Sequence, residues 1–251
     1  MEIKQAHQHF QSGGEAYAHY RPTYPATLAE ALAALSPAQQ LAVDVGCGTG
    51  QLSVLLANHF DQVIATDVSA DQLSHATAHP KVVYRQEAAE TISVEDNSAD
   101  LIVAAQAAHW FDLERFYDEV RRIARPGAVL ALVSYSVPYL EGTANTCFQQ
   151  FYWQQTTPFW PAERQHVETG YTKLPFPFET IPTPELAIHR KWNIDELMGY
   201  IKTWSASRQA IAAGEQQIFD ELQHELAVFW GDPNQRRPIT WPINLRLGHV
   251  R

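Results

Sequence analysis

The chain has 251 residues, of which 45% are hydrophobic and 18% are charged, and its formal net charge is −10. This length is enough for one large hydrophobic core, in one α/β domain with an appendage or in two domains. The acidic balance argues against binding along nucleic-acid phosphates, which requires clustered Lys and Arg. We therefore expect no nucleic-acid partner.

Cysteine content and apolar segments indicate a cytoplasmic protein. The two cysteines, Cys47 and Cys147, do not form a readable disulfide framework. Residues 1–14 lack the apolar stretch of a secretory signal, and the most apolar windows are too short to span a bilayer. The histidines show no metal-binding spacing. We therefore expect a reducing compartment, no membrane partner and no bound metal.

Strand and helix patterns alternate from residue 26 to residue 135. The chain begins this region with a predicted helix at 26–35, which Ser36-Pro37 ends. Apolar runs predict strands at 41–45, 62–67, 81–85, 99–106 and 127–135. Helical spacing predicts helices at 51–60, 69–79 and 113–125. This alternation is typical of right-handed βαβ units around a buried parallel sheet.

The composition changes after Tyr135. Residues 138–184 are rich in proline and aromatic residues. Later patterns predict a strand at 186–192, helices at 193–209 and 214–230, and a last strand at 239–248. The sequence therefore predicts seven strands, with a cap elaborated around the last two of them and not a separately folding domain.

A glycine-rich turn follows the first predicted strand, in the stretch LAVDVGCGTGQL. A phosphate-binding loop for nucleoside triphosphates would end in Gly-Lys-Ser or Gly-Lys-Thr, and no lysine lies between Lys4 and Lys81. A dinucleotide fingerprint would place its third glycine at the position of Gln51. The carboxylate of Asp44, just before the turn, would repel a pyrophosphate and attract an ammonium group. The turn therefore indicates adenosine that carries an amino-acid tail.

Asp67 supports the same ligand. It ends the second predicted strand, 21 residues after Gly46, where a carboxylate accepts hydrogen bonds from both ribose hydroxyls. An alternative role is to cap the helix that begins near Ser69, although Ser69 can supply that cap itself.

Four stretches in order resemble the motifs of class I S-adenosylmethionine-dependent methyltransferases of the type-11 group. They are VDVGCGTGQL, ATDVSADQL, RQEAAETISVEDNSADLIVAAQAAHWFD and RIARPGAVLAL, within about residues 10–135. The blocks YAHYRPTYP and AQAAHWFD are similar to the branch that contains trans-aconitate methyltransferase. The resemblance implies S-adenosylmethionine as cofactor and in-line methyl transfer to a small-molecule acceptor, at a carboxylate or hydroxyl oxygen.

The resemblance also implies a Rossmann-like α/β fold, with a mostly parallel seven-stranded sheet and helices on both faces. We expect an N-terminal helical lid at 1–37 and a cofactor-binding core at 38–135. An acceptor-binding cap of helices and aromatic residues is expected at 136–236. The final strand, within 237–251, returns to the core sheet.

The resemblance assigns a set of cofactor-binding positions. Tyr17 and Arg21 would lie near the cofactor carboxylate, and Gln106 would border the sulfonium. Where the family commonly has Gly-Asp-Ala-Glu, this chain has Glu-Ala-Ala-Glu at 87–90. The complete predicted set is Tyr17, Arg21, Asp44, Gly46, Cys47, Gly48, Gly50, Asp67, Val68, Glu87, Ala88, Ala89 and Gln106.

His109 is the predicted catalytic residue. It follows the fourth strand at its carboxyl end, where open α/β sheets place ligands. It is expected either to bind the acceptor or to act as a general base, and its alternative role is to order the turn before Trp110. The predicted acceptor-binding residues are His109, Trp110, Tyr135, Trp204 and Arg208, the last by pairing with a carboxylate.

Two other functions stay open at this point. A non-catalytic S-adenosylmethionine-binding regulatory module would carry the same cofactor motifs, because methyl transfer requires no signature catalytic residue. A nicotinamide-dependent oxidoreductase would share the fold, but Asp44 and Gln51 count against it.

Overall fold

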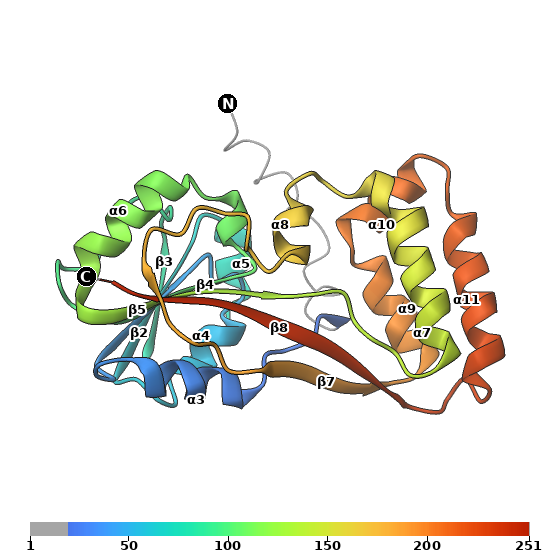
Figure 1. Cartoon of the computed structure of the whole chain (residues 1–251), viewed down its shortest axis with the longest axis horizontal. Helices are drawn as coiled ribbons and strands as arrows, with labels where there is room; N and C mark the ends of the chain where they lie inside the picture. Colours follow the sequence, from blue (N-terminus) through green and yellow to red (C-terminus); the bar gives the residue numbers. More distant parts are fainter. Residues whose placement is uncertain (1–19, 251) are drawn as a thin grey trace.

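A computed structural model describes residues 20–250, and its centre is one eight-stranded sheet (Figure 1). The strand order is β3-β2-β1-β4-β5-β8-β6, and β7 also pairs with β8. The strands are β1 (Leu41–Val45), β2 (Gln62–Asp67), β3 (Val82–Gln86), β4 (Ala99–Ala105), β5 (Ala124–Tyr135), β6 (Glu179–Thr180), β7 (Leu186–Trp192) and β8 (Arg237–His249). The first five strands are parallel, and β8 runs antiparallel to its neighbours β5, β6 and β7. The predicted fold class is confirmed, and the two-residue β6 is the strand that the pattern did not predict.

The sheet is buried on both faces because its strand residues alternate between two hydrophobic clusters. Ala42, Leu101 and Val129 belong to one cluster, and their neighbours Val43 and Ile102 belong to the other. Helices α3 (Ala26–Leu35) and α4 (Gln51–Leu56) supply the first cluster, and α6 (Leu113–Ile123) supplies the second. The short α5 (Ala70–Ser74) connects β2 to β3. Near-continuous apolar strands are what a sheet covered on both sides requires.

A group of helices, here called the cap, lies at one end of the molecule (Figure 1). It comprises α7 (Thr143–Gln150), a π-helical turn (Phe151–Thr156), a 3-10 turn (Thr157–Phe159), α9 (Ile194–Lys202), α10 (Ser205–Ala212) and α11 (Gln217–Trp230). Strands β7 and β8 extend from the sheet to these helices (Figure 1). The apolar residues of the cap and those under α3 and α4 form a single buried cluster. The cap therefore shares its core with the sheet.

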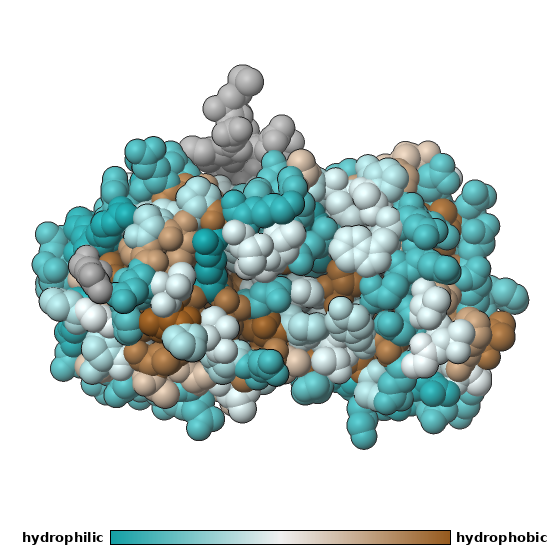
Figure 2. Space-filling model, in the orientation of Figure 1, coloured by the Kyte–Doolittle hydropathy of each residue, from teal (hydrophilic) through white to brown (hydrophobic). Residues whose placement is uncertain are grey.

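Figure 2 shows a mainly hydrophilic face with small apolar patches between the polar residues. Among residues 20–250, no helix has the length and apolar character that crossing a membrane demands.

The predicted helix at 193–209 is two helices, α9 and α10. The backbone at Trp204 is extended, with φ −69° and ψ 145°, so the helix breaks there. The hydroxyls of Thr203 and Ser207 donate to the carbonyls of Tyr200 and Ile201, at 2.6 Å each. Such side-chain bonds compete with the helical ladder, and the break turns Trp204 into the buried cap interior.

Two further differences concern the N-terminal lid and residues 138–184. The lid expectation falls mostly on residues 1–19, which lie outside the described part, whereas α3 packs against α4 and the sheet. In the region rich in proline and aromatic residues, the structure contains α7, the π-helical turn and α8 (Arg164–Glu168), which no pattern had predicted. Predicted helix 69–79 ends at Ser74.

Candidate functional site

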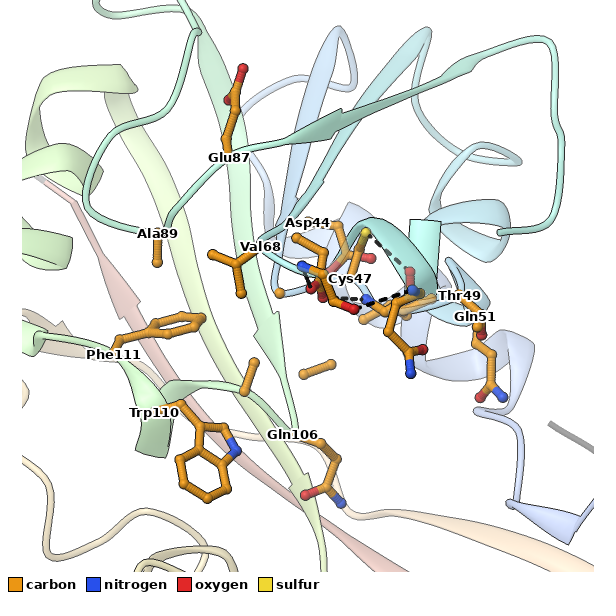
Figure 3. Close-up of a pocket in the computed structure, with 18 of the residues that line it drawn as sticks. Asp44, Cys47, Thr49, Gln51, Val68, Glu87, Ala89, Gln106, Trp110 and Phe111 are labelled. Carbon is orange, nitrogen blue, oxygen red and sulfur yellow. Dashed lines mark hydrogen bonds between the residues drawn. The ribbon is translucent and has the colours of Figure 1, made fainter. Parts of the chain in front are cut away.

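A cavity of about 400 Å³ lies at the carboxyl ends of β1, β2 and β4 (Figure 3). Its walls come mainly from the segments that follow these strands and β3, together with Arg21, Tyr24 and Tyr135. Open α/β sheets bind ligands at this edge, where the strand order reverses on either side of the first strand. The volume suits a small molecule.

Three glycines give the turn after β1 its shape. Gly46, Gly48 and Gly50 have φ values of +72°, +56° and +76°. These left-handed conformations cost little only for glycine. A Cβ on Gly46 would lie 2.5 Å from the Cβ of Ala107, so this position also lacks room for a side chain. The turn thus brings bare backbone to the cavity.

Asp67 ties the turn after β1 to the turn after β2. Its Oδ2 accepts from the Gly48 N–H at 2.8 Å, and its Oδ1 accepts from the Ser69 N–H at 2.8 Å. Ser69 itself caps α5, with its side chain accepting from the Gln72 N–H. A carboxylate has about four acceptor positions, so Asp67 retains capacity for ribose hydroxyls.

Asp44 is a buried carboxylate in the cavity wall. Its Oδ2 accepts from the Ser53 hydroxyl at 2.6 Å, whereas its Oδ1 has no hydrogen-bond partner in the described part of the chain. Burial, together with the nearby Asp67 charge, raises the pKa of Asp44 to about 7, although the Ser53 hydrogen bond opposes the shift. An ammonium group in the cavity would satisfy the open oxygen. The site therefore fits the methionine end of S-adenosylmethionine.

Cys47 lies beside Asp44 in Figure 3. Burial is the main cause that raises the pKa of its thiol, and the carboxylates of Asp44 and Asp67 raise it further. The thiol is therefore protonated and poorly nucleophilic. Its contribution to the cavity is a small apolar surface.

An apolar surface suited to a flat ring lies across the cavity from the turn. Val68, Ala89 and Phe111 line this part, as Figure 3 shows. The carboxylate of Glu87 points away from the cavity and accepts from the Ser93 N–H at 2.9 Å. The Glu-Ala-Ala-Glu segment thus places a methyl group, and no carboxylate, against the ring position.

Gln106 and Trp110 lie on a third side of the cavity (Figure 3). Gln106 has a left-handed backbone with φ +57°, and its N–H donates to the Val133 carbonyl at 2.8 Å. Arg21 also lines the cavity, donates to the Tyr135 hydroxyl at 3.5 Å, and lies over the Tyr200 ring at 5.7 Å. A polar amide, a guanidinium and aromatic rings thus surround this side.

Most of the predicted site residues that the structure describes line the cavity. They are Arg21, Asp44, Gly46, Cys47, Gly48, Asp67, Val68, Glu87, Ala89, Gln106, Trp110 and Tyr135. Gly50 and Ala88 do not line it, because Gly50 packs under the Tyr84 ring and Ala88 lies in the connection after β3. Tyr17 lies outside the described residues.

His109, the predicted catalytic residue, does not line the cavity. Its Nδ1 lies 3.0 Å from the Tyr171 hydroxyl oxygen, and its ring packs against Trp110 with centroids 4.9 Å apart. Burial is the main cause that lowers its pKa to about 3, and the Arg164 and His166 charges lower it further. The imidazole is therefore neutral and supports Trp110 from behind.

Two predicted acceptor residues are also placed elsewhere. Trp204 is buried among cap aromatics and does not reach the cavity. Arg208 is an exposed residue of α10 that donates to the Thr203 carbonyl at 3.3 Å. The sequence pattern predicted one helix over both positions, whereas the chain breaks between α9 and α10 at Trp204.

The sequence reasoning missed several cavity residues. Most follow the predicted motifs directly, and the general placement of ligands at strand ends could have found them. Tyr24 lies in the block YAHYRPTYP that carries the resemblance, but it was not named as a site residue. The missed residues are Tyr24, Thr49, Gln51, Leu52, Ser69, Ala70, Asp71, Gln72, Gln86, Ala105, Ala107 and Phe111.

Comparison with known proteins points to methyltransferases. A family model for a methyltransferase domain matches residues 43–132. A Dictyostelium discoideum protein that is named as a methyltransferase is 31% identical over 221 residues, which are 86% of this chain and 84% of that protein. A Saccharomyces cerevisiae protein named as an S-adenosylmethionine-dependent methyltransferase is 32% identical over 133 residues, about half of each chain.

A solved structure extends this similarity to the cap. The protein from Anaeromyxobacter dehalogenans, described as a type II methyltransferase, is 40% identical and has a TM-score of 0.89, with 92% of this chain and 98% of that chain covered. Similarity over such a share of both chains, with the cofactor motifs in the cavity wall, leaves no support for a nicotinamide-dependent oxidoreductase. The chain belongs to the S-adenosylmethionine-dependent methyltransferases, and its cofactor is S-adenosylmethionine.

Proposed function

We propose that the enzyme methylates a carboxylate oxygen of a small organic acid. The observation that supports this acceptor is the set of ionisable groups near Gln106. Among the described residues of that side, these are Arg21, Tyr24 and Tyr135. None of the three is a base in its ordinary protonation state, and a carboxylate needs none because it is already deprotonated at neutral pH.

A hydroxyl acceptor would require a general base, and the residues between 20 and 250 that line this side of the cavity do not supply one. His109 does not line the cavity, and its pKa of about 3 makes it a weak base. An efficient base has a pKa near the working pH. The hydroxyl alternative is therefore less favoured.

The bound cofactor supplies an electrophilic methyl group on a sulfonium, and the protein aligns the acceptor with it. Asp44 is suited to hold the cofactor ammonium and Asp67 the ribose hydroxyls. Arg21 and Gln106 would orient polar groups of the acceptor. Trp110 and Tyr135 exclude water from that space. Alignment of this kind accounts for as much as ~7–11 kcal/mol of a reaction barrier.

The sequence also supports a narrower proposal, that the acceptor is of the kind used by the trans-aconitate methyltransferase branch. The blocks at 17–25 and 105–112 carry that resemblance. In the second block, Gln106 and Trp110 face the cavity. The proposed partner is therefore a small carboxylic acid.

The test is turnover with cofactor labelled in its methyl group, against a panel of organic acids and matched alcohols. We expect a base-labile methyl ester on an acid. With the cofactor at saturation, so that Asp44 titration does not limit binding, kcat should show no pH limb between pH 6 and 8. His109→Asn should retain turnover within about tenfold, because removing a general base costs about 10²–10⁴-fold. Tyr171→Phe is the matched control, since it removes the same hydrogen bond and leaves the imidazole in place.

Methylation of alcohols only, with a neutral pH limb that His109→Asn abolishes, would contradict the carboxylate proposal. It would return His109 to the role of general base.

A further inference from the structure

A charged arginine lies at the boundary between the sheet and the cap, outside the cavity described above. Arg164 begins α8, and its side chain is 17% exposed. Its Nε donates to the Tyr152 hydroxyl at 3.1 Å, and its guanidinium lies over the Trp160 ring at 4.7 Å. Burying a charge costs free energy unless partners compensate it, so the remaining contacts of this guanidinium matter.

The polar contacts that the described residues make with the Arg164 guanidinium involve only its Nε edge. The Glu168 carboxylate is 3.7 Å from Nε, and its Oε1 is held at 2.5 Å by the Tyr152 hydroxyl. Within residues 20–250, Nη1 and Nη2 of Arg164 make no hydrogen bond, and neither is among the fully enclosed polar atoms. The two outer nitrogens therefore present their donors to accessible space, while Tyr152 and Glu168 fix the inner edge.

Arg164 belongs to α8, which packs against the turn Ala108–Trp110 that carries the cavity residue Trp110. On one flank, His109 packs behind the cavity residue Trp110, and the Arg164 charge contributes to lowering the pKa of His109. On the other flank, the cavity residue Arg21 lies over the Tyr200 ring, and Tyr200 acts electrostatically on Arg164. Figure 1 shows α8 between the sheet and the cap helices. Arg164 therefore lies near the side of the cavity that Gln106 and Trp110 line.

We propose that Arg164 determines acceptor specificity by binding an anionic group of the acceptor, remote from the oxygen that is methylated. A guanidinium fork binds a carboxylate through two parallel hydrogen bonds. Tyr152 and Glu168 act as positioning residues that hold the fork, and Trp160 supports its face. This inference rests on the proposed function and adds a second recognition point, so the acceptor carries two anionic groups.

The test measures binding without turnover. The complex with S-adenosylhomocysteine is titrated by calorimetry with C4–C6 dicarboxylates, with tricarballylate, and with their monomethyl esters, which carry one charge less. We expect at least one of these polyanions to bind about 10- to 100-fold more tightly than its ester, as charge-assisted hydrogen bonds imply. Arg164→Gln should abolish that difference and leave the affinity for S-adenosylhomocysteine within a few-fold.

Two further variants address the risk that Arg164→Gln does not fold. Arg164→Lys keeps the charge without the fork and should retain part of the preference. Tyr152→Phe removes the bond to Nε and should weaken polyanion binding several-fold. Arg121→Gln, at an exposed arginine of α6 that pairs with Asp118, is the matched control and should behave as wild type.

The proposal is overturned if no polyanion of the panel binds, if esters bind equally well, or if all Arg164 and Tyr152 variants keep wild-type preference. Methyl transfer to monoanionic acids alone would leave the proposed function intact and remove the role of Arg164. Polyanion binding without methyl transfer to any acid would support anion binding by Arg164 and contradict the proposed function.

Discussion

At the scale of a single residue, burial changes the protonation of Asp44. Its pKa is about 7 in the folded chain against an ordinary 3.8, because burial disfavours the charged carboxylate. Between these two values the folded state binds more protons than the unfolded state, so the free energy of unfolding falls as pH rises. Above about pH 7 the folded chain bears the full free-energy cost of burying the ionised Asp44 carboxylate. A bound ammonium group can then offset that cost.

We therefore predict opposite effects of Asp44→Asn on stability and on affinity. Asparagine can still accept from the Ser53 hydroxyl but never ionises. The free energy of unfolding of the ligand-free variant should therefore exceed that of the wild type by up to about 4 kcal/mol at pH 8, and by little at pH 4. Affinity for S-adenosylhomocysteine should fall, and its rise with pH through about 7 should disappear. Urea unfolding and calorimetry at several pH values measure both effects.

Ser53→Ala is the control for this prediction. It removes the hydrogen bond that lowers the Asp44 pKa, so the pH at which affinity rises should move upward. Equal pH dependence in wild type and Asp44→Asn would show that another group is responsible.

At the scale of an element, the turn after β1 depends on contact with the turn after β4. Gly46 and Gly48 both have positive φ, but they differ in the room that each leaves for a Cβ atom. A Cβ on Gly46 would collide with Ala107, whereas one on Gly48 would meet only the flexible Gln72 side chain at 3.6 Å. Both substitutions to alanine carry a conformational cost of about 1–2 kcal/mol.

We predict that Gly46→Ala weakens S-adenosylhomocysteine binding by more than tenfold beyond the effect of Gly48→Ala. The collision should displace the turn from β4, while the Gly48 variant should keep it in place. Calorimetry measures the affinities, and thermal unfolding shows whether each variant folds. Equal losses in the two variants would mean that backbone strain, and not the contact with Ala107, controls the turn.

The elements that the sequence predicts well are those whose pattern is local. The buried strands β1, β2 and β4 read as continuous apolar runs, and each ends in the residues that line the cavity. The break at Trp204 was missed because helical periodicity continues across it, and only the tertiary burial of the indole favours an extended residue there. The two-residue β6 is too short to produce a pattern.

The same distinction explains the site. The positions of Asp44 and Asp67 in the cavity wall were predicted because they follow from strand ends and glycine spacing, which are local features. His109 and Arg208 were placed in the acceptor site by proximity in sequence to motifs, yet their side-chain directions depend on Tyr171 and on the α9–α10 break. Arg164 gave no signal, since its partners come from α8 and the π-helical turn that precedes it.

At the scale of the whole molecule, the cap and the sheet share one buried core. One buried cluster runs from α3 and α4 to the cap helices, and β8 crosses from one to the other. Six tryptophans belong to the cap or to its connecting strands, at positions 153, 160, 192, 204, 230 and 241, whereas Trp110 lies at the cavity. Tryptophan fluorescence therefore reports mainly on the cap.

We predict that thermal unfolding followed by tryptophan fluorescence and by far-UV circular dichroism gives coincident transitions, and that S-adenosylhomocysteine shifts both equally. A ligand at 100 times its Kd adds about 2.7 kcal/mol to the free energy of unfolding. This raises the Tm of a chain of this size by roughly 5–10 °C. NAD, NADP and ATP should cause no shift, and Asp67→Asn should reduce the shift because it weakens the hold on the ribose. A circular-dichroism transition that moves with ligand while fluorescence does not would mean that the cap unfolds on its own, since a separately folding cap gains nothing from a ligand bound at the sheet.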